Sequence, residues 1–175
     1  LDELFLAVRG GGARFERPVR GDASVSIGSS DCRSLDDALL GTGFPYHRGA
    51  TARVNLCICA RALTRVRGLR RAGSAALDLC HVGLGRLDGY WEMGLNDWDV
   101  AAATLVAREA GARVTDFLGR DDVLGARRIV AAPLSIQGEL LEMIGQAHAA
   151  PDLDPLGPVP VVPVPLVGPL PTELG

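Results

Sequence analysis

The sequence predicts an α/β fold in which helices cover both faces of a sheet. From about residue 37 to residue 149, apolar strand-like runs alternate with amphipathic helical stretches, a pattern typical of layered α/β proteins. The 175 residues suffice for one domain with a substantial core and are too few for two ordinary domains. Apolar residues make up 47% of the chain and charged residues 22%, which indicates a globular protein rather than a disordered one.

The first part of the chain is predicted to be rich in strands. Two short apolar runs, residues 4–9 and 13–16, flank three consecutive glycines, which fits a hairpin or a bulged turn. Residues 21–31 are rich in Gly, Ser and Asp and are expected to form a loop around a short strand. A buried strand over residues 37–42 should end at Gly43 and Pro45.

Helices and strands then alternate regularly. In order, the pattern predicts a helix over residues 50–63, a strand near 66–70, a helix over 74–85, a strand over 87–91, a helix over 99–110, strands over 113–117 and 128–132, and a helix from about residue 134. The helix over 99–110 should end at Gly111, because glycine takes the left-handed conformation of a C-cap. The last helix has one apolar face, formed by Ile136, Leu140, Ile144 and Ala147.

The chain divides into three segments, residues 1–48, 49–149 and 150–175. The last has eight prolines in its final twenty-five residues. Proline removes a backbone donor and blocks both helix and central strand, so this tail is predicted to be a disordered or polyproline-like linker. A ligand for an SH3-type domain is the alternative, although the arginines that usually flank such ligands are missing.

Charge and cysteine content exclude several classes of function. The net charge is −3, so we expect neither nucleic acid nor an anionic membrane as a partner. All eighteen cationic residues are Arg, which excludes a Lys Schiff base and a P-loop Lys. Cys57 and Cys59 lie two residues apart in a predicted helix, so their side chains point about 200° apart and a shared zinc ion is not expected.

We expect a cytoplasmic location with buried, reduced thiols. No stretch approaches the roughly 20 apolar residues of a membrane span, and the acidic pair Asp2-Glu3 argues against a signal peptide. The first residue is Leu1 rather than Met, which hints that the natural start lies upstream.

Two predicted helix starts carry polar groups. Gly73, Ser74 and Ala75 open one helix, where free backbone N–H groups can receive an outside acceptor; an ordinary capped core helix is the competing interpretation. Asp99 opens the other, and Glu92 ends the preceding strand seven residues earlier. Two such carboxylates can converge on one cleft and suit a polar ligand or a hard cation, whereas a structural helix cap is again the competing interpretation for Asp99.

Five motifs in order resemble the inositol monophosphatase family. They are DELFLAVRGGGA, LLGTGFPY, GSAALDL, GRLDGYWE, and WDVAA followed by EAG, and the resemblance extends from Asp2 to about Ala147. It implies the sugar-phosphatase fold of that family, an α+β layered sandwich with helices on both faces of a mixed sheet. It also implies that this chain is the C-terminal half, with residues 1–48 completing a sheet of the N-terminal half and residues 49–149 forming the C-terminal subdomain.

The resemblance implies roles for particular residues. Asp99 corresponds to the aspartate that binds a catalytic Mg²⁺ near the leaving-group oxygen, and Glu92 to the glutamate that hydrogen-bonds substrate hydroxyls. Gly73, Ser74 and Ala75 correspond to the helix start that contacts the sugar or inositol ring. The implied reaction is hydrolysis of myo-inositol 1-phosphate, with another polyol phosphate, histidinol phosphate, fructose bisphosphate or phosphoadenosine phosphate as alternative substrates within the superfamily.

Two metal-binding motifs of that family, G-E-E and D-P-[IL]-D-G-T, are absent from this sequence. We therefore expect the remaining Mg²⁺ ligands outside this chain, assign no catalytic residue within it, and expect negligible phosphatase activity from it alone. A catalytically inactive remnant or an interaction module is the alternative. The edges of the first strands would be unpaired in this chain, and such edges can pair with a second copy, so a homodimer is a further possibility.

Overall fold

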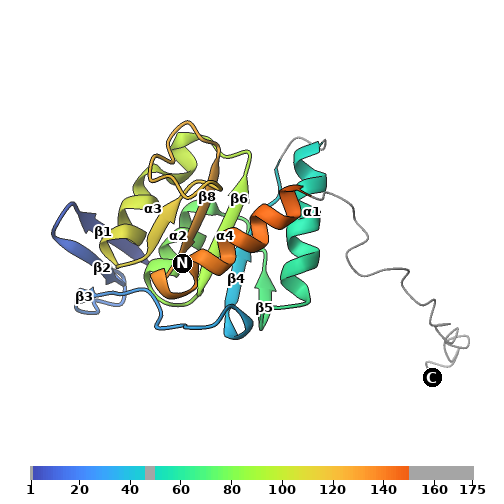
Figure 1. The fold of residues 1–175 in the computed structure, drawn as a ribbon. Helices are drawn as coiled ribbons and strands as arrows, with labels where there is room; N and C mark the ends of the chain where they lie inside the picture. The colour runs from blue at the N-terminus through green and yellow to red at the C-terminus, as the bar shows by residue number, and fades with distance from the viewer. Residues whose placement is uncertain (1, 46–49, 150–175) are drawn as a thin grey trace, which may run out of the picture.

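The computed structural model describes residues 2–45 and 50–149 (Figure 1). The elements are β1 (Leu4–Val8), β2 (Gly12–Glu16), β3 (Val25–Ser26), a 3₁₀ turn η1 (Leu35–Asp37), β4 (Leu39–Thr42), α1 (Ala50–Leu63), β5 (Gly68–Arg70), α2 (Ala75–Gly83), β6 (Gly89–Met93), α3 (Asp97–Glu109), β7 (Arg113–Thr115), β8 (Arg128–Ala132) and α4 (Leu134–Ala149). The proline-rich tail, residues 150–175, lies outside the described residues, so its predicted state stays a prediction.

A mixed five-stranded sheet forms the centre of the fold. Its strand order is β5-β4-β6-β8-β7, with β4 parallel to both β5 and β6, and β8 antiparallel to both β6 and β7. Successive residues of β6 face opposite sides: Tyr90 packs in the cluster formed with α2 and α3, and Trp91 in the cluster formed with α1 and α4. Helices therefore cover both faces of the sheet, which confirms the predicted fold class (Figure 1).

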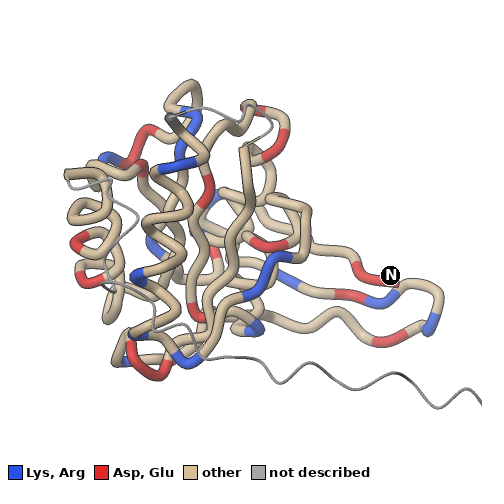
Figure 2. The backbone as a smooth tube through the Cα atoms, turned by 90° about the vertical axis from the view of Figure 1, so that its right-hand side faces the viewer, with Lys and Arg blue, Asp and Glu red and all other residues tan. Residues whose placement is uncertain are grey.

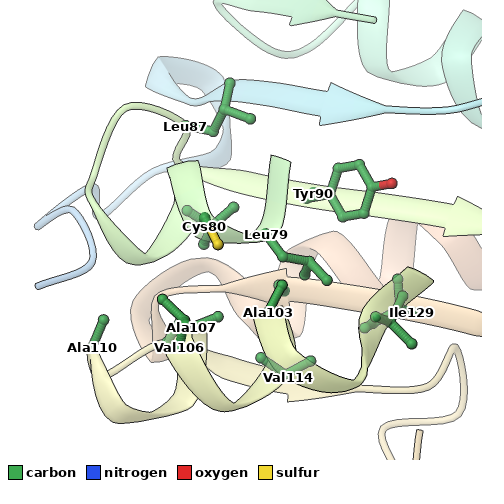
Figure 3. Close-up of a cluster of buried hydrophobic side chains, with 14 of the residues drawn as sticks. Leu79, Cys80, Leu87, Tyr90, Ala103, Val106, Ala107, Ala110, Val114 and Ile129 are labelled. Atoms are coloured by element: carbon green, nitrogen blue, oxygen red, sulfur yellow. The ribbon is translucent and has the colours of Figure 1, made fainter. Parts of the chain in front are cut away.

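The layer of α2 and α3 is close-packed because its contact residues are small. A Cβ added at Gly83 of α2 would lie 3.3 Å from the Cβ of Ala110 and 3.4 Å from the Cα of Ala107. Figure 3 shows Ala103 and Ala107 of α3 on the side of that helix that faces Leu79 and Cys80 of α2, with Tyr90 on the neighbouring strand β6. The Ala-rich composition of α3 thus lets the two helices approach closely over the sheet.

The first three strands form a separate antiparallel sheet, β1-β2-β3, beside α3 (Figure 1). The predicted glycine turn is confirmed, since Gly10 and Gly12 take positive φ angles of 73° and 78°. Glu109, at the end of α3, accepts hydrogen bonds of 2.9 Å from the backbone N–H groups of both glycines. This contact attaches the hairpin to the helix.

The proposed division at residue 48 stays a prediction. β4 lies on the N-terminal side of it, yet this strand pairs with β5 and β6 in the five-stranded sheet. β1 is the end strand of the three-stranded sheet, and no strand among the described residues pairs with its outer edge.

Several predicted boundaries are wrong by a few residues. The strand predicted over residues 37–42 begins at Leu39, because residues 35–37 form the 3₁₀ turn, whose start is capped by the Ser34 side chain. The helix predicted from Asp99 begins at Asp97, with Asn96 as its N-cap. Competing cap residues within four positions explain the error, since Asn and Asp are equally good N-caps.

Charges are interspersed along the chain rather than gathered in a block of one sign (Figure 2). None of the four cysteines, all of which lie within the described ranges, forms a disulfide; Cys57, Cys59 and Cys80 are buried and Cys32 is half-buried. Among the described residues, no helix combines the length and apolar character that crossing a membrane requires.

Candidate functional site

One pocket of about 250 Å³ brings together all the candidate site residues. Gly73, Ser74 and Ala75 reach it from the start of α2, Glu92 from β6, and Asp99 from the first turn of α3. A strand and two helix starts therefore meet at one cleft, as the sequence predicted for the two carboxylates.

The start of α2, residues 73–76, lines the pocket. Gly73 has a φ of 99°, a conformation that favours glycine, and Ser74 is an extended N-cap residue. The Ser74 side chain accepts a hydrogen bond of 3.4 Å from the N–H of Leu77. This bond satisfies the N3 donor and leaves the earlier N–H groups, those of Ala75 and Ala76, without an intrahelical partner by their position in the helix.

Glu92 is half-buried and held in place by its neighbours. The Tyr90 hydroxyl donates a hydrogen bond to Glu92 Oε2. A Cβ at Gly43, which directly follows the adjacent strand β4, would overlap the Glu92 carboxylate, so only glycine leaves room for it. Burial raises the pKa of Glu92, while the Tyr90 hydrogen bond and the Arg71 charge act in the opposite direction.

Asp99 is the third residue of α3 rather than its cap. Its Oδ2 accepts a hydrogen bond of 2.9 Å from the backbone N–H of Asn96. The carboxylate thus stabilises the helix start through one oxygen, and no group in the described part of the chain bonds to Oδ1. Asp99 therefore stabilises the start of α3, which was one of the two interpretations of the sequence. Its Oδ1 can at the same time accept a bond from a ligand in the pocket.

A buried carboxylate, that of Asp78, lies within electrostatic reach of Glu92. Asp78, one turn into α2, is 2% exposed, and burial together with the charge of Glu92 raises the pKa of its carboxyl to about 6, with Arg71 lowering it in part. A Cβ at Gly41 would lie 3.9 Å from the Asp78 Cγ and 3.2 Å from the Tyr90 ring. Gly41 in β4 and Gly43 just after it thus leave space for Asp78, Tyr90 and Glu92.

The sequence did not single out three further lining residues, Arg71, Phe44 and Trp98. Arg71 is the only cation among the described residues that line the pocket, and its Nη1 lies 2.5 Å from the position of a Cβ added at Gly73. Trp98 directly precedes Asp99 in a motif that we did recognise, so its place in the motif was the available signal. Phe44 likewise lies in the recognised motif LLGTGFPY. Arg71 lies in none of the five motifs, and only the tertiary fold brings it to the cleft.

A complete metal centre is not found within the described residues 2–45 and 50–149, where no group of three or more His, Cys, Asp or Glu side chains could hold a metal ion. The available carboxylate oxygen of Asp99 is the kind of hard ligand that Mg²⁺ prefers. The residues present therefore fit one ligand of a magnesium site and not the whole of it.

The fold and the pocket define a layered α+β protein with a pocket at the junction of a strand and two helix starts. The model of the inositol monophosphatase family matches residues 1–150. The chain belongs to this family.

Relatives with several names support this assignment. Nus factor SuhB of Haemophilus influenzae is 38% identical over 143 residues, covering 82% of this chain and 51% of the relative. Inositol-1-monophosphatase of Mesorhizobium japonicum is 40% identical over 152 residues, covering 86% and 54%. The solved structure of inositol monophosphatase from Anabaena is 37% identical with a TM-score of 0.73, covering 82% and 54%. The chain spans about half the length of the curated relatives it matches.

Proposed function

We propose that this chain is the polyol-binding half of a Mg²⁺-dependent phosphomonoesterase that converts myo-inositol 1-phosphate and water to myo-inositol and phosphate. The observation that supports it is the convergence of the five candidate residues on one pocket. They come from three separate segments of the chain, and each occupies a position for which the family resemblance implies contact with the substrate or the metal.

Each pocket residue has a defined task in this proposal. Glu92 accepts a hydrogen bond from a ring hydroxyl through Oε1, since Oε2 already accepts from Tyr90. The first N–H groups of α2 donate to further substrate oxygens. Asp99 would be one ligand of Mg²⁺, and the ion would supply Lewis-acid stabilisation of developing negative charge.

The electrostatics of the pocket are consistent with an anionic substrate that arrives with a cation. Arg71 attracts the phosphate ester, whereas Glu92 and Asp99 would repel it unless Mg²⁺ intervenes. The described residues supply no complete metal centre, so we propose that the other metal ligands come from outside this chain and that the chain alone has negligible phosphatase activity. A cytoplasmic location, supported by four cysteines that form no disulfide, and a homodimer belong to the same proposal.

A second candidate is a non-catalytic role. Relatives named Nus factor SuhB match this chain at 38–40% identity, which is as close as the match to the relative named for its phosphatase activity. In such a role we propose a macromolecular partner, and nucleic acid, which we did not expect from the net charge of −3, is then a candidate.

A fusion protein separates the two candidates. The part of the Mesorhizobium japonicum inositol-1-monophosphatase that this chain does not match, about half of that enzyme, is joined to the present chain. We expect Mg²⁺-dependent release of phosphate from myo-inositol 1-phosphate, and loss of that release in the Asp99→Asn fusion. A well-folded fusion without activity on inositol, histidinol, fructose or nucleotide phosphates would favour the non-catalytic role.

A further inference from the structure

The pocket has an aromatic side that none of the assigned roles uses. Trp98 is 81% exposed and Phe44 is 41% exposed, and both line the cleft with Ser74, Glu92 and Asp99. The lining of the cleft is therefore amphipathic, because it combines two carboxylates and a helix start with two aromatic side chains.

The two tryptophans of the chain have opposite environments. Trp91 is fully buried, and its Nε1–H donates to Asn55 Oδ1 at 3.0 Å, so this indole is a core residue. Trp98 takes no comparable part in the core, although Val100, two residues further along the helix, is buried. Packing against the described residues thus does not account for a large indole at the second position of α3.

The chemistry of a cyclic polyol matches this arrangement. Its hydroxyl groups project from the rim of the ring, and its C–H groups form an apolar face of partial positive charge. The face of an indole carries the negative part of the ring quadrupole and attracts such groups, while Glu92 and the α2 N–H groups take the hydroxyls. An acyclic polyol phosphate offers the same phosphate and hydroxyls and no continuous C–H face.

We propose that Trp98, assisted by Phe44, is a specificity-determining residue that packs against the C–H face of a cyclic polyol and so favours ring-shaped over acyclic polyol phosphates. This inference rests on the proposed function, because the class of ligand comes from it. It adds the basis on which the pocket distinguishes members of that class.

The environments of the two tryptophans make the inference testable on the present chain. Acrylamide should quench Trp98 and leave Trp91 unquenched, and saturating myo-inositol 1-phosphate should protect Trp98 from the quencher. Inorganic phosphate, used as a second probe, should give no protection. If Trp98 is already shielded in the free chain, protein covers the indole and the inference is wrong.

Affinity measurements by ligand-observed NMR supply the second test. Trp98→Ala should weaken binding of myo-inositol 1-phosphate about threefold to tenfold, Trp98→Phe should weaken it less, and glycerol 3-phosphate should bind all three proteins equally. Leu118→Ala, which truncates a residue that is 74% exposed and absent from the pocket lining, is the matched control and should change neither affinity.

Each outcome separates this inference from the proposed function. Equal weakening for the cyclic and acyclic ligands, an unchanged affinity in Trp98→Ala, or no binding of myo-inositol 1-phosphate by the wild-type chain would overturn the role of Trp98. Phosphate release by the fusion protein tests the proposed function independently of all three results.

Discussion

Replacing Asp78 by Asn should raise the free energy of unfolding at pH 7. The side chain is buried, and the pKa of its carboxyl is raised to about 6 from an ordinary value of 3.8. A raised carboxyl pKa means that the folded state holds the proton more tightly than the unfolded chain does. Ionisation of Asp78 therefore destabilises the fold.

The magnitude follows from the two pKa values. A difference of about two pKa units corresponds to about 3 kcal/mol at roughly 1.4 kcal/mol per unit. As the pH rises through 3.8 the unfolded chain loses its proton first, so stability falls up to about pH 6 and the loss is complete above it. A buried asparagine amide requires partners of its own, which offsets roughly 1–2 kcal/mol; we expect a net gain of about 1–2 kcal/mol at pH 7.

Urea unfolding of the wild type and Asp78→Asn at pH 4 and pH 7 measures this directly. The gain should appear at pH 7 and vanish or reverse at pH 4, where the folded wild-type carboxyl is protonated. Asp22→Asn, at an exposed site in the hairpin sheet region, is the matched control and should stay within about 0.5 kcal/mol at both pH values. Lower stability of Asp78→Asn at pH 7 would refute the reasoning, since it would show that the ionised carboxylate makes a favourable interaction.

Three further variants test the site and its support. Gly43→Ala should displace the Glu92 carboxylate and weaken binding of myo-inositol 1-phosphate about tenfold by calorimetry; an unchanged affinity would remove Glu92 from the binding surface. Asn55→Leu should lower the urea-derived unfolding free energy by about 2–4 kcal/mol, because the Trp91 indole N–H and the Gly43 carbonyl lose their partner; a loss below about 0.5 kcal/mol would contradict this. Asp99→Asn should change that free energy by less than about 0.5 kcal/mol, since Asn can accept the same helix-start hydrogen bond, and a larger loss would make Asp99 chiefly a structural residue.

Helices whose apolar residues recur at helical spacing could be predicted from the sequence. The last helix follows from the spacing of Ile136, Leu140 and Ile144, all of which are fully buried, and α1 was predicted with its observed bounds. The strands β4, β6 and β8 are mostly apolar, so their existence was clear. Their ends were not, because no periodic signal marks where pairing with a neighbour stops.

Only those residues of the candidate site that lie in recognisable sequence motifs could be predicted. Glu92 and Asp99 could be placed on one cleft because a strand end and a helix start lay close in sequence. The space that Gly41 and Gly43 leave beside β6 depends on which side chains lie over them, and no pattern local to their own segment specifies those partners. Arg71 enters the pocket for the same tertiary reason.

Backbone amide NMR of the present chain during titration with myo-inositol 1-phosphate tests whether the pocket binds a polyol phosphate. We predict chemical-shift changes at Gly73–Ala76, Glu92 and Trp98–Asp99, which line the pocket. The larger cavity of about 490 Å³ along the outer side of α3, near Thr104 and Arg108, should show none. Shifts confined to that second cavity, or no shifts at ligand concentrations that saturate the longer relatives, would contradict the assignment of the pocket as a polyol phosphate site.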